Sequence, residues 1–339
     1  MDEFAEGAPC WADAALPDLR AGERFYGELF GWTFARGGTD TAAGDAFPRH
    51  SRALLDGKPV GALVAKRDGR MPTTWGVHLA TPDLLGTVEK IRRAGGTVLT
   101  GPSGVGSYGR SALAADPEGA VFAVWQGGTR PGFGATDVPG AFCWTEVYVR
   151  NAEAADAFYP AVFGYALQDP PFDAGDFKTW ALPGSGREVA GRAIVGDVVP
   201  AGMPPHFLLY FRVADVGESL ATVRRAGGRV LVERQEIPGA TFAVVVDNQG
   251  AAFAMMDGES GGDGGSRESG ASQEPGASGA SDGDAAARPG EAAGEGGAGS
   301  AAGGPGAGPA AAAGGPGRGT AAAPDAEPPS APATSADGA

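Results

Sequence analysis

The chain has 339 residues and a formal net charge of −15, from 26 Lys and Arg residues against 41 Asp and Glu residues. Nucleic-acid-binding domains carry clustered positive charge, and helices that lie on membranes are basic and amphipathic. The sequence has neither pattern, so we expect no nucleic acid and no membrane as partner. The first residues lack the features of a signal peptide, and two cysteines make no disulfide framework, so we expect a cytoplasmic protein.

The first part of the chain contains two successive cycles of predicted elements. A strand at residues 10–15 leads to a helix with Asp18 as its N-cap and Gly31 at its C-terminal end. A strand at residues 73–80 leads to a second helix, with Asp83 as its N-cap. Three strands are predicted after each helix, at residues 32–36, 46–55 and 59–66 in the first cycle and at 97–100, 110–115 and 120–126 in the second. Each cycle therefore has the order βαβββ.

This pair of cycles occurs twice. Cys-Trp, Phe-Tyr and Phe-Gly-aromatic recur at the same spacing in APCWADAALPDLRAGERFYGELFGW, from Ala8, and in AFCWTEVYVRNAEAADAFYPAVFGY, from Ala141. IRRAGGTVL recurs as VRRAGGRVL, and ADPEGAVFAVW as VDNQGAAFAMM. Matching blocks in the same order indicate a duplicated module. In the second copy, Pro160 lies inside the first predicted helix and should kink or shorten it, because proline removes an amide donor.

The end of the chain has a different composition. From Gly258 onward it has no Val, Leu, Ile, Met, Phe, Tyr or Trp and consists mainly of Gly, Ala, Pro, Ser, Asp and Glu. Such a segment cannot bury enough apolar surface to offset the entropy lost on folding. We therefore predict an α+β protein with a first module at 8–127, a linker at 128–140, a second module at 141–257 and a disordered acidic tail at 258–339.

The FY…FG helices, the AGG before a strand and the DP-x-G hairpin resemble those of the vicinal oxygen chelate superfamily, and most closely its tandem proteins of the glyoxalase/bleomycin-resistance/dioxygenase type. The resemblance covers about residues 8–257. It implies that each module is a pair of βαβββ units forming a half-open barrel with a cleft on its concave face. The superfamily includes isomerases, dioxygenases, thiol transferases, epimerases and drug-binding proteins, so the fold does not fix the function.

The resemblance also implies where a divalent metal would bind. Enzymes of the superfamily hold it with His, Glu or Gln side chains on the first and last strands of each βαβββ unit. The six corresponding positions in this sequence are Trp11, Gly76 and Ala123 in the first module and Trp144, Leu208 and Ala254 in the second. None of these residues provides a metal ligand. We therefore expect no metal site and no cofactor.

In place of metal ligands, the equivalent first strands carry an indole beside a carboxylate: Trp11 and Asp13 in one module, Trp144 and Glu146 in the other, with Tyr148 on the same face. Asp13 and Glu146 are the candidate catalytic residues, as general bases. The alternative is that they bond to neighbouring backbone or Arg groups and stabilise the barrel. The full set of expected ligand-binding residues is Trp11, Asp13, Trp75, His78, Trp144, Glu146, Tyr148, Phe207 and Tyr210, with Trp125 and Met255 as further candidates for the lining.

The histidines and cysteines are placed by the alternation of side chains along strands. His78 and His206 are predicted on the cleft face, at positions that are not equivalent in the two modules, and His50 at a polar edge. His78 is either a lining residue with one hydrogen bond or a polar contact and proton carrier for a ligand. Cys10 and Cys143 are predicted on the helix-facing side, as buried and unreactive thiols.

These observations favour a metal-independent protein that binds a small organic molecule and sequesters an antibiotic or metabolite. The alternative is an enzyme of the superfamily, namely a lyase, an isomerase or an oxygenase or hydroxylase, that acts on a small organic substrate. A third hypothesis is an interaction protein with the acidic tail as a spacer. Because tandem fusion supplies within one chain what single-module relatives obtain by dimerising, we expect a monomer or a weak homodimer.

Overall fold

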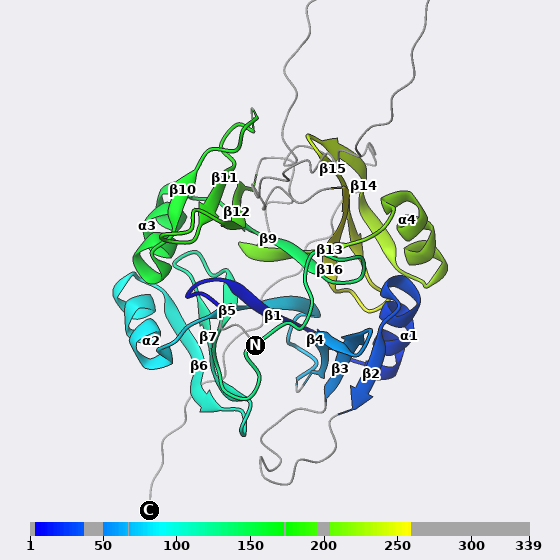
Figure 1. Ribbon diagram of the computed structural model, residues 1–339, viewed down its shortest axis with the longest axis horizontal. Helices are drawn as coiled ribbons and strands as arrows, with labels where there is room; N and C mark the ends of the chain where they lie inside the picture. Colours follow the sequence, from blue (N-terminus) through cyan, green and yellow to red (C-terminus); the bar gives the residue numbers. More distant parts are fainter. Residues whose placement is uncertain (1–3, 37–49, 67, 173, 196–203, 259–339) are drawn as a thin grey trace, which may run out of the picture.

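The computed structural model describes residues 4–36, 50–66, 68–172, 174–195 and 204–258 (Figure 1). The predicted tail and the start of the strand predicted at residues 46–55 lie outside this part of the chain. Within it, every predicted helix and strand is present, in the predicted order. Among the helices so described, none is long and apolar enough to cross a lipid bilayer.

The first module consists of two βαβββ units, as predicted. Its elements are β1 (Pro9–Leu16), α1 (Leu19–Phe30), β2 (Thr33–Arg36), β3 (His50–Leu55), β4 (Lys58–Ala65), β5 (Thr74–Ala80), α2 (Leu84–Arg93), β6 (Thr97–Gly104), β7 (Gly109–Ala115) and β8 (Val121–Gly127).

The second module repeats this order. Its elements are β9 (Phe142–Val149), α3 (Ala152–Phe163), β10 (Ala166–Gln168), β11 (Lys178–Ala181), β12 (Glu188–Ile194), β13 (His206–Arg212), α4 (Val216–Arg225), β14 (Arg229–Ile237), β15 (Ala240–Val246) and β16 (Ala252–Gly258).

The helices begin and end where the sequence signals place them. The Asp18 carboxylate accepts hydrogen bonds from two backbone amides of the first turn of α1, and Gly31 closes the helix in the left-handed conformation, at a φ of 71°. Asn151 and Gly164 do the same for α3, which contains Pro160. The prediction that Pro160 shortens this helix is wrong, because α1 and α3 both have 12 residues. Pro160 lies in the last turn, where its carbonyl still accepts the bond from the capping glycine.

Each module forms one mixed sheet, so the α+β prediction is confirmed. The strand orders are β2-β3-β4-β1-β5-β8-β7-β6 and β10-β11-β12-β9-β13-β16-β15-β14. The two units of each module join through an antiparallel pair of first strands, β1 with β5 and β9 with β13. The last strand of each unit runs parallel to the first strand, as β4 does beside β1.

The two sheets pack back to back, with the main core between them. Figure 1 shows α1 beside α4 and α2 beside α3, while β5 and β13 meet in the middle. Aromatic rings from both modules interlock there: Phe30 lies 5.2 Å from Phe211 and 5.9 Å from Phe253. This core also contains Trp75, whose ring centroid lies 4.9 Å from that of Phe211. The face of each sheet that does not meet this core is therefore left for a cleft.

Two equivalent tyrosines join the modules through buried hydrogen bonds. The Tyr26 hydroxyl, on α1, donates to Asp247 Oδ2 in the β15–β16 turn at 2.8 Å. The Tyr159 hydroxyl, on α3, donates to Asp116 Oδ2 in the β7–β8 turn at 3.1 Å. Burial, followed by the neighbouring carboxylate, raises the pKa of both phenols well above the ordinary value, so both remain protonated donors. The contact is reciprocal, because each module supplies one tyrosine and one turn.

The same two turns also hold the start of the neighbouring module's helix. Glu118, in the β7–β8 turn, accepts hydrogen bonds from the backbone amides of Arg150 and Asn151 at 3.0–3.1 Å. Gln249, in the β15–β16 turn, accepts from the amide of Asp18 at 2.8 Å and donates to its carbonyl at 2.9 Å. The DP-x-G hairpin that identifies the module in the sequence is thus also the part that docks it.

The segment predicted as a linker, 128–140, packs against both modules. Phe133 is buried and stacks on Phe142 at 5.1 Å between ring centroids, with Trp11 at 5.7 Å. Its amide donates to the carbonyl of Cys10 at 2.8 Å. The connection between the modules is therefore part of the folded structure along the edge of β1.

The Tyr26→Phe substitution tests the contact between modules. It removes the donor to Asp247 Oδ2, and it leaves the Trp75 indole N–H, which is 2.9 Å from the Tyr26 hydroxyl, without this acceptor. Buried polar groups without partners are costly, so we expect the free energy of unfolding to fall by about 1–3 kcal/mol in chemical denaturation. Thr33→Val, at an exposed position with a long hydrogen bond of 3.4 Å, is the control and should stay within about 0.5 kcal/mol of wild type. Equal stability of Tyr26→Phe and wild type would contradict this account.

Candidate functional site

The central strand β1 separates core side chains from cleft side chains. Ala12 and Ala14 are fully buried and face the core between the modules. Trp11 and Asp13 alternate with them and lie partly exposed on the opposite face. The predicted alternation along this strand is confirmed, and Asp13 lies on the cleft face of the first module.

Asp13 and His78 form a pair in this cleft. His78 Nε2 lies 3.1 Å from Asp13 Oδ2, and 34% of the Asp13 side chain is exposed against 14% of that of His78. The other ring nitrogen, His78 Nδ1, is buried and has no hydrogen-bond partner. The carboxylate is therefore the part of the pair that a molecule in the cleft meets, and the imidazole lies behind it.

The absence of a side chain at Gly76 leaves space for the Asp13 carboxylate. The two residues are partners across β1 and β5, and a Cβ at position 76 would lie 3.4 Å from Asp13 Oδ1. A larger side chain here would cover the carboxylate. The equivalent residue in the second module is Leu208, which faces Glu146.

Aromatic and small residues surround the pair. The Trp125 ring lies 6.5 Å from that of His78, and its indole N–H donates to the carbonyl of Arg130 at 3.0 Å. A hollow of about 390 Å³ opens beside it, with Phe4, Ala80 and Trp125 among its lining residues. Ala80 lies two residues beyond His78 along β5 and pairs with Trp125, so the hollow lies past the His78 end of the pair and is lined by neither Asp13 nor His78.

Arg52 is a cleft residue that the sequence analysis missed. It lies on β3 between Ser51 and Ala53, which are buried on the helix side, so its own side chain points to the cleft face. It pairs with Ala62, and Ala62 pairs with Asp13. Arg52 Nε is buried without a hydrogen-bond partner. The alternation of this strand in the sequence was the available signal, but only metal-ligand residue types were sought there.

The second module has a carboxylate at the equivalent place in a different setting. Glu146 is only 4% exposed and accepts hydrogen bonds on Oε2 from the hydroxyls of Tyr210, at 2.8 Å, and Tyr148, at 3.0 Å. Burial raises the pKa of Glu146, and the two phenols oppose that shift only in part. Tyr210 occupies the place of His78, as both pair with the tryptophan of the first strand.

Side chains fill this second cleft. Phe177 is buried against Gly191, where a Cβ would lie 2.6 Å from its ring and 3.1 Å from the side chain of Glu146. Trp144, Tyr148 and Tyr210 belong to a separate apolar cluster on the same face. His206 stacks on Tyr148 with 5.4 Å between ring centroids. The two clefts are therefore not equivalent: the first leaves its carboxylate partly exposed and the second buries it.

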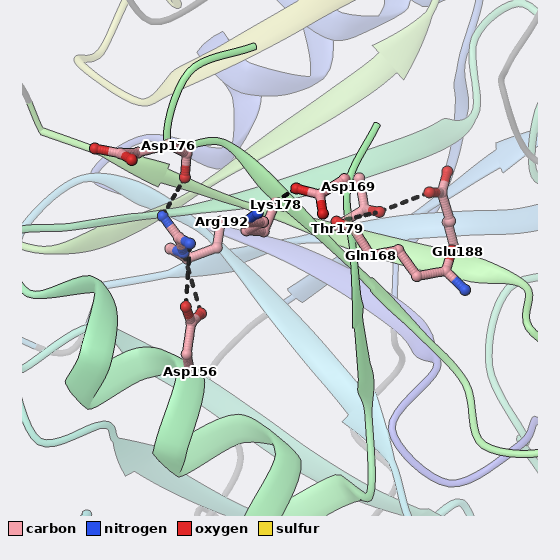
Figure 2. Close-up of polar contacts among 8 residues, drawn as sticks. All are labelled: Asp156, Gln168, Asp169, Asp176, Lys178, Thr179, Glu188 and Arg192. Atoms are coloured by element: carbon pink, nitrogen blue, oxygen red, sulfur yellow. Dashed lines mark hydrogen bonds and ion pairs between the residues drawn. The ribbon is translucent and has the colours of Figure 1, made fainter. Parts of the chain in front are cut away.

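Arg192, on β12 of the second module, has a structural role (Figure 2). It is 2% exposed and points to the helix side of β12, where its guanidinium makes two 3.1 Å bonds to the Asp156 carboxylate on α3. Figure 2 also shows its contact with the carbonyl of Asp176. Thr179, on the neighbouring strand, occupies the place that Arg52 has in the first module and donates to Glu188 at 2.6 Å.

Three residues expected to line a cleft lie in the core instead. Trp75, Phe207 and Met255 are buried between the modules, at 2%, 8% and 0% exposure. Trp75 donates to Tyr26, and Phe207 packs on Phe122 and Tyr159. The physical reason is the two-residue period of the strand: with His78 on the cleft face, Trp75 must face the helices. These residues are corrected to core positions.

Both cysteines are buried, as predicted, but the helix-facing placement is wrong for Cys143. It belongs to the apolar cluster on the cleft face, because the pairing of β9 with β13 shifts register beside it. Cys10 and Cys143 are both buried, and each thiol lies 3.4–3.5 Å from a carbonyl of the neighbouring strand. Burial raises the pKa of Cys143 to about 12 and that of Cys10 further. Neither thiol is a nucleophile in this environment.

The residues on the cleft faces do not fit the metal of the superfamily. All six positions named above lie on cleft faces, and they carry indole, aliphatic or glycine groups. Across the described ranges, no three His, Cys, Asp or Glu side chains come together as a metal-binding group. Asp13 and His78 supply two donors, whereas a divalent ion in a protein needs three or four. We therefore assign no step to a metal.

Comparison with known proteins agrees with this fold. Residues 12–125 match the model of the glyoxalase-like domain family. Over 271 residues, 76% of this chain and 95% of the relative, the sequence is 35% identical to the anthracycline biosynthesis protein DnrV of Streptomyces peucetius. It is 32% identical over 258 residues, 75% of this chain and 96% of the relative, to the putative glyoxylase CFP32 of Mycobacterium bovis.

Solved structures share the architecture at low sequence identity. The Mn(II)-bound glyoxalase from Novosphingobium aromaticivorans aligns with a TM-score of 0.52 and 14% identity, covering 75% of this chain and 83% of that one. The 2,3-dioxygenase LapB from Pseudomonas sp. KL28 aligns with a TM-score of 0.53 and 13% identity, covering 75% and 94%. With its duplicated βαβββ pairs and these relatives, the chain belongs to the vicinal oxygen chelate superfamily, as a tandem pair of glyoxalase-like modules.

Proposed function

We propose that this protein is an enzyme that moves a proton on a small organic substrate bound in the cleft of the first module. Asp13 is the general base and His78 the residue that positions it. The observation that carries the proposal is the Asp13–His78 pair, in which the carboxylate is 34% exposed and the imidazole 14%. Among the classes considered from the sequence, this corresponds to an isomerase.

The surroundings of the pair suit such a substrate. Trp11 and Trp125 give apolar surfaces on the His78 side of the carboxylate. Trp125 also lines a hollow of about 390 Å³ further along the same face. Pockets for small organic molecules combine apolar walls with a few placed polar groups. A carboxylate that is held by a donor and partly shielded from water is a suitable general base.

The proposed step is a proton transfer that balances without a further reactant. Asp13 Oδ1 takes a proton from a carbon next to a carbonyl, and the electron pair of the C–H bond moves to give an enolate. His78 donates from Nε2 to Asp13 Oδ2 and keeps the other oxygen directed into the cleft. Where the substrate has a β,γ double bond, the enolate is a dienolate. Return of the proton from the Asp13 carboxyl to its γ-carbon then shifts the double bond into conjugation with the carbonyl and completes an isomerisation.

The relatives also support an enzyme. Two of them are named as anthracycline biosynthesis proteins and others as putative glyoxylases, and the chain covers 95–96% of their lengths. A biosynthetic role on a small organic molecule favours the enzyme over the sequestering protein that the sequence alone favoured. We assign the catalytic role to the first module, because Glu146 in the second is buried under two tyrosines.

Replacement of Asp13 by Asn tests the base. The probes are aromatic ketones of one to three rings that carry a hydrogen next to the carbonyl, incubated in D₂O, with hydrogen–deuterium exchange followed by NMR. Wild type should accelerate exchange of at least one probe, and Asp13→Asn should lower that acceleration about 10²-fold or more. Glu146→Gln, the matched change in the second module, should retain it.

Two further measurements separate catalysis from folding. His78→Ala should lower the maximal rate of exchange with little change in the probe concentration that gives half of that rate, because His78 holds the base and does not contact the probe. A folding defect would instead lower the thermal unfolding midpoint, which is measured on the same variant. Dialysis against EDTA should leave the rate unchanged, since the pair offers only two metal donors. No acceleration with any probe, or equal rates for Asp13→Asn and wild type, would rule out the proposed function.

The buried Glu146 predicts a pH dependence of stability. Its folded pKa lies above the ordinary value of 4.5, so the unfolded state ionises first as pH rises. The ionised carboxylate is disfavoured in the fold. The contribution of Glu146 to the free energy of unfolding is therefore lowest at pH values above its folded pKa. We expect Glu146→Gln to gain stability relative to wild type as pH rises from 4.5, in chemical denaturation at pH 4 to 8. A difference that stays constant, or that grows toward acid pH, would show that Glu146 is ionised in the fold.

A further inference from the structure

We propose that Arg52 binds a carboxylate group of the substrate, so that the first module takes aromatic monocarboxylates. This inference rests on the proposed function, because it places the second recognition group in the same cleft as the Asp13–His78 pair. Its distinct basis is the position of Arg52 on β3 and the buried Nε atom of its guanidinium, which has no hydrogen-bond partner.

Arg52 belongs to the same cross-strand row as Asp13. The row runs from Arg52 on β3 through Ala62 on β4 to Asp13 on β1 and Gly76 on β5. Neighbouring strands lie about 4.8 Å apart, so the backbones of Arg52 and Asp13 are separated by about 10 Å. Ala62 lies between them and is buried, at 6% exposure, so a ligand that reaches both groups lies over this row and does not enter it.

On this face the cation Arg52 lies at one end of the cross-strand row, and the proposed base Asp13 lies toward the other. His50 lies two residues before Arg52 on the same face of β3, and Asp13 is the acidic group across the row. Within the described ranges, no ion pair joins Arg52 to Asp13, and Arg52 Nε has no hydrogen-bond partner. A buried guanidinium N–H without an acceptor is unfavourable. A ligand anion would provide the acceptor that the protein does not.

The chemistry of arginine indicates the class of anion. Its planar guanidinium matches a carboxylate with two parallel hydrogen bonds, which a single enolate oxygen cannot accept. The indoles of Trp11 and Trp125 lie toward the Asp13 end and provide faces for aromatic rings. A planar ring system that lies over the row between Arg52 and Asp13, with a carboxylate at the Arg52 end, satisfies both groups.

The second module supports the assignment by contrast. Thr179 replaces Arg52 there, is 4% exposed and donates to Glu188, so this position has its polar contact within the protein. In the first module the equivalent position carries a longer, cationic side chain without such a contact.

The experiment measures binding by titration calorimetry with the full chain. The probes are benzoate, 2-naphthoate and anthracene-2-carboxylate, each paired with its neutral amide. We expect wild type to bind at least one carboxylate at least tenfold more tightly than its amide, which corresponds to about 1.4 kcal/mol. Arg52→Gln should lose this preference and leave the affinity for the amide within about twofold. Arg93→Gln, the same change at an exposed position on α2, should keep the preference.

Two results would overturn the proposal: no carboxylate binds to wild type, or Arg52→Gln still prefers carboxylate over amide. Thermal unfolding of Arg52→Gln and Arg52→Lys accompanies the titrations, and retained affinity for the amide shows that the cleft is intact. The outcome is separate from that of the proton-transfer assay. Loss of carboxylate preference with unchanged ketone exchange supports Arg52 as an anion site, whereas carboxylate binding without any exchange activity contradicts only the catalytic proposal.

Discussion

The reciprocal pair of tyrosine–aspartate hydrogen bonds is the contact on which the arrangement of this molecule depends. Tyr26 and Tyr159 are fully buried, and each finds its acceptor only in the other module. The other carboxylate oxygen of Asp116 and of Asp247 accepts backbone amides of its own turn. The shape of the turn, the position of the helix and the packing of the two sheets are thereby coupled. Because the sheets are held back to back, each cleft faces away from the core.

Most of the fold could be predicted from the sequence, because its signals are local. Asp18 and Gly31 set the ends of α1 through backbone geometry, and the two-residue period of β1 separates Ala12 in the core from Asp13 on the cleft face. What the repeat could not indicate is that its Phe-Tyr and Asp-x-x-Gly motifs meet across modules. That contact depends on packing between segments more than 200 residues apart, as Tyr26 and Asp247 are.

The candidate site was predicted in part. The cleft face of Asp13 and His78 follows from alternation, yet their contact depends on the register between β1 and β5, which the sequence does not encode locally. The same alternation places Trp75 on the core face. Its assignment to the cleft was wrong because it relied on the aromatic side chain and not on the position of the residue in the strand. Arg52 was not predicted because only residue types that bind metals were considered on its strand, and arginine is not one of them. Duplication preserved the fold, whereas Phe177 and the tyrosines around Glu146 filled one of the two clefts.

The turn residues that hold the neighbouring helix differ in charge between the two copies. Glu118 faces the amides at Asn151, a neutral cap, whereas Gln249 faces those at Asp18, a charged one. If two first modules from different chains paired as the modules do here, Glu118 would meet Asp18, and two carboxylates would lie together at the start of one helix. Like charges at such a contact disfavour that association. This difference between the copies thus favours pairing of each first module with the second module of its own chain over pairing with another first module.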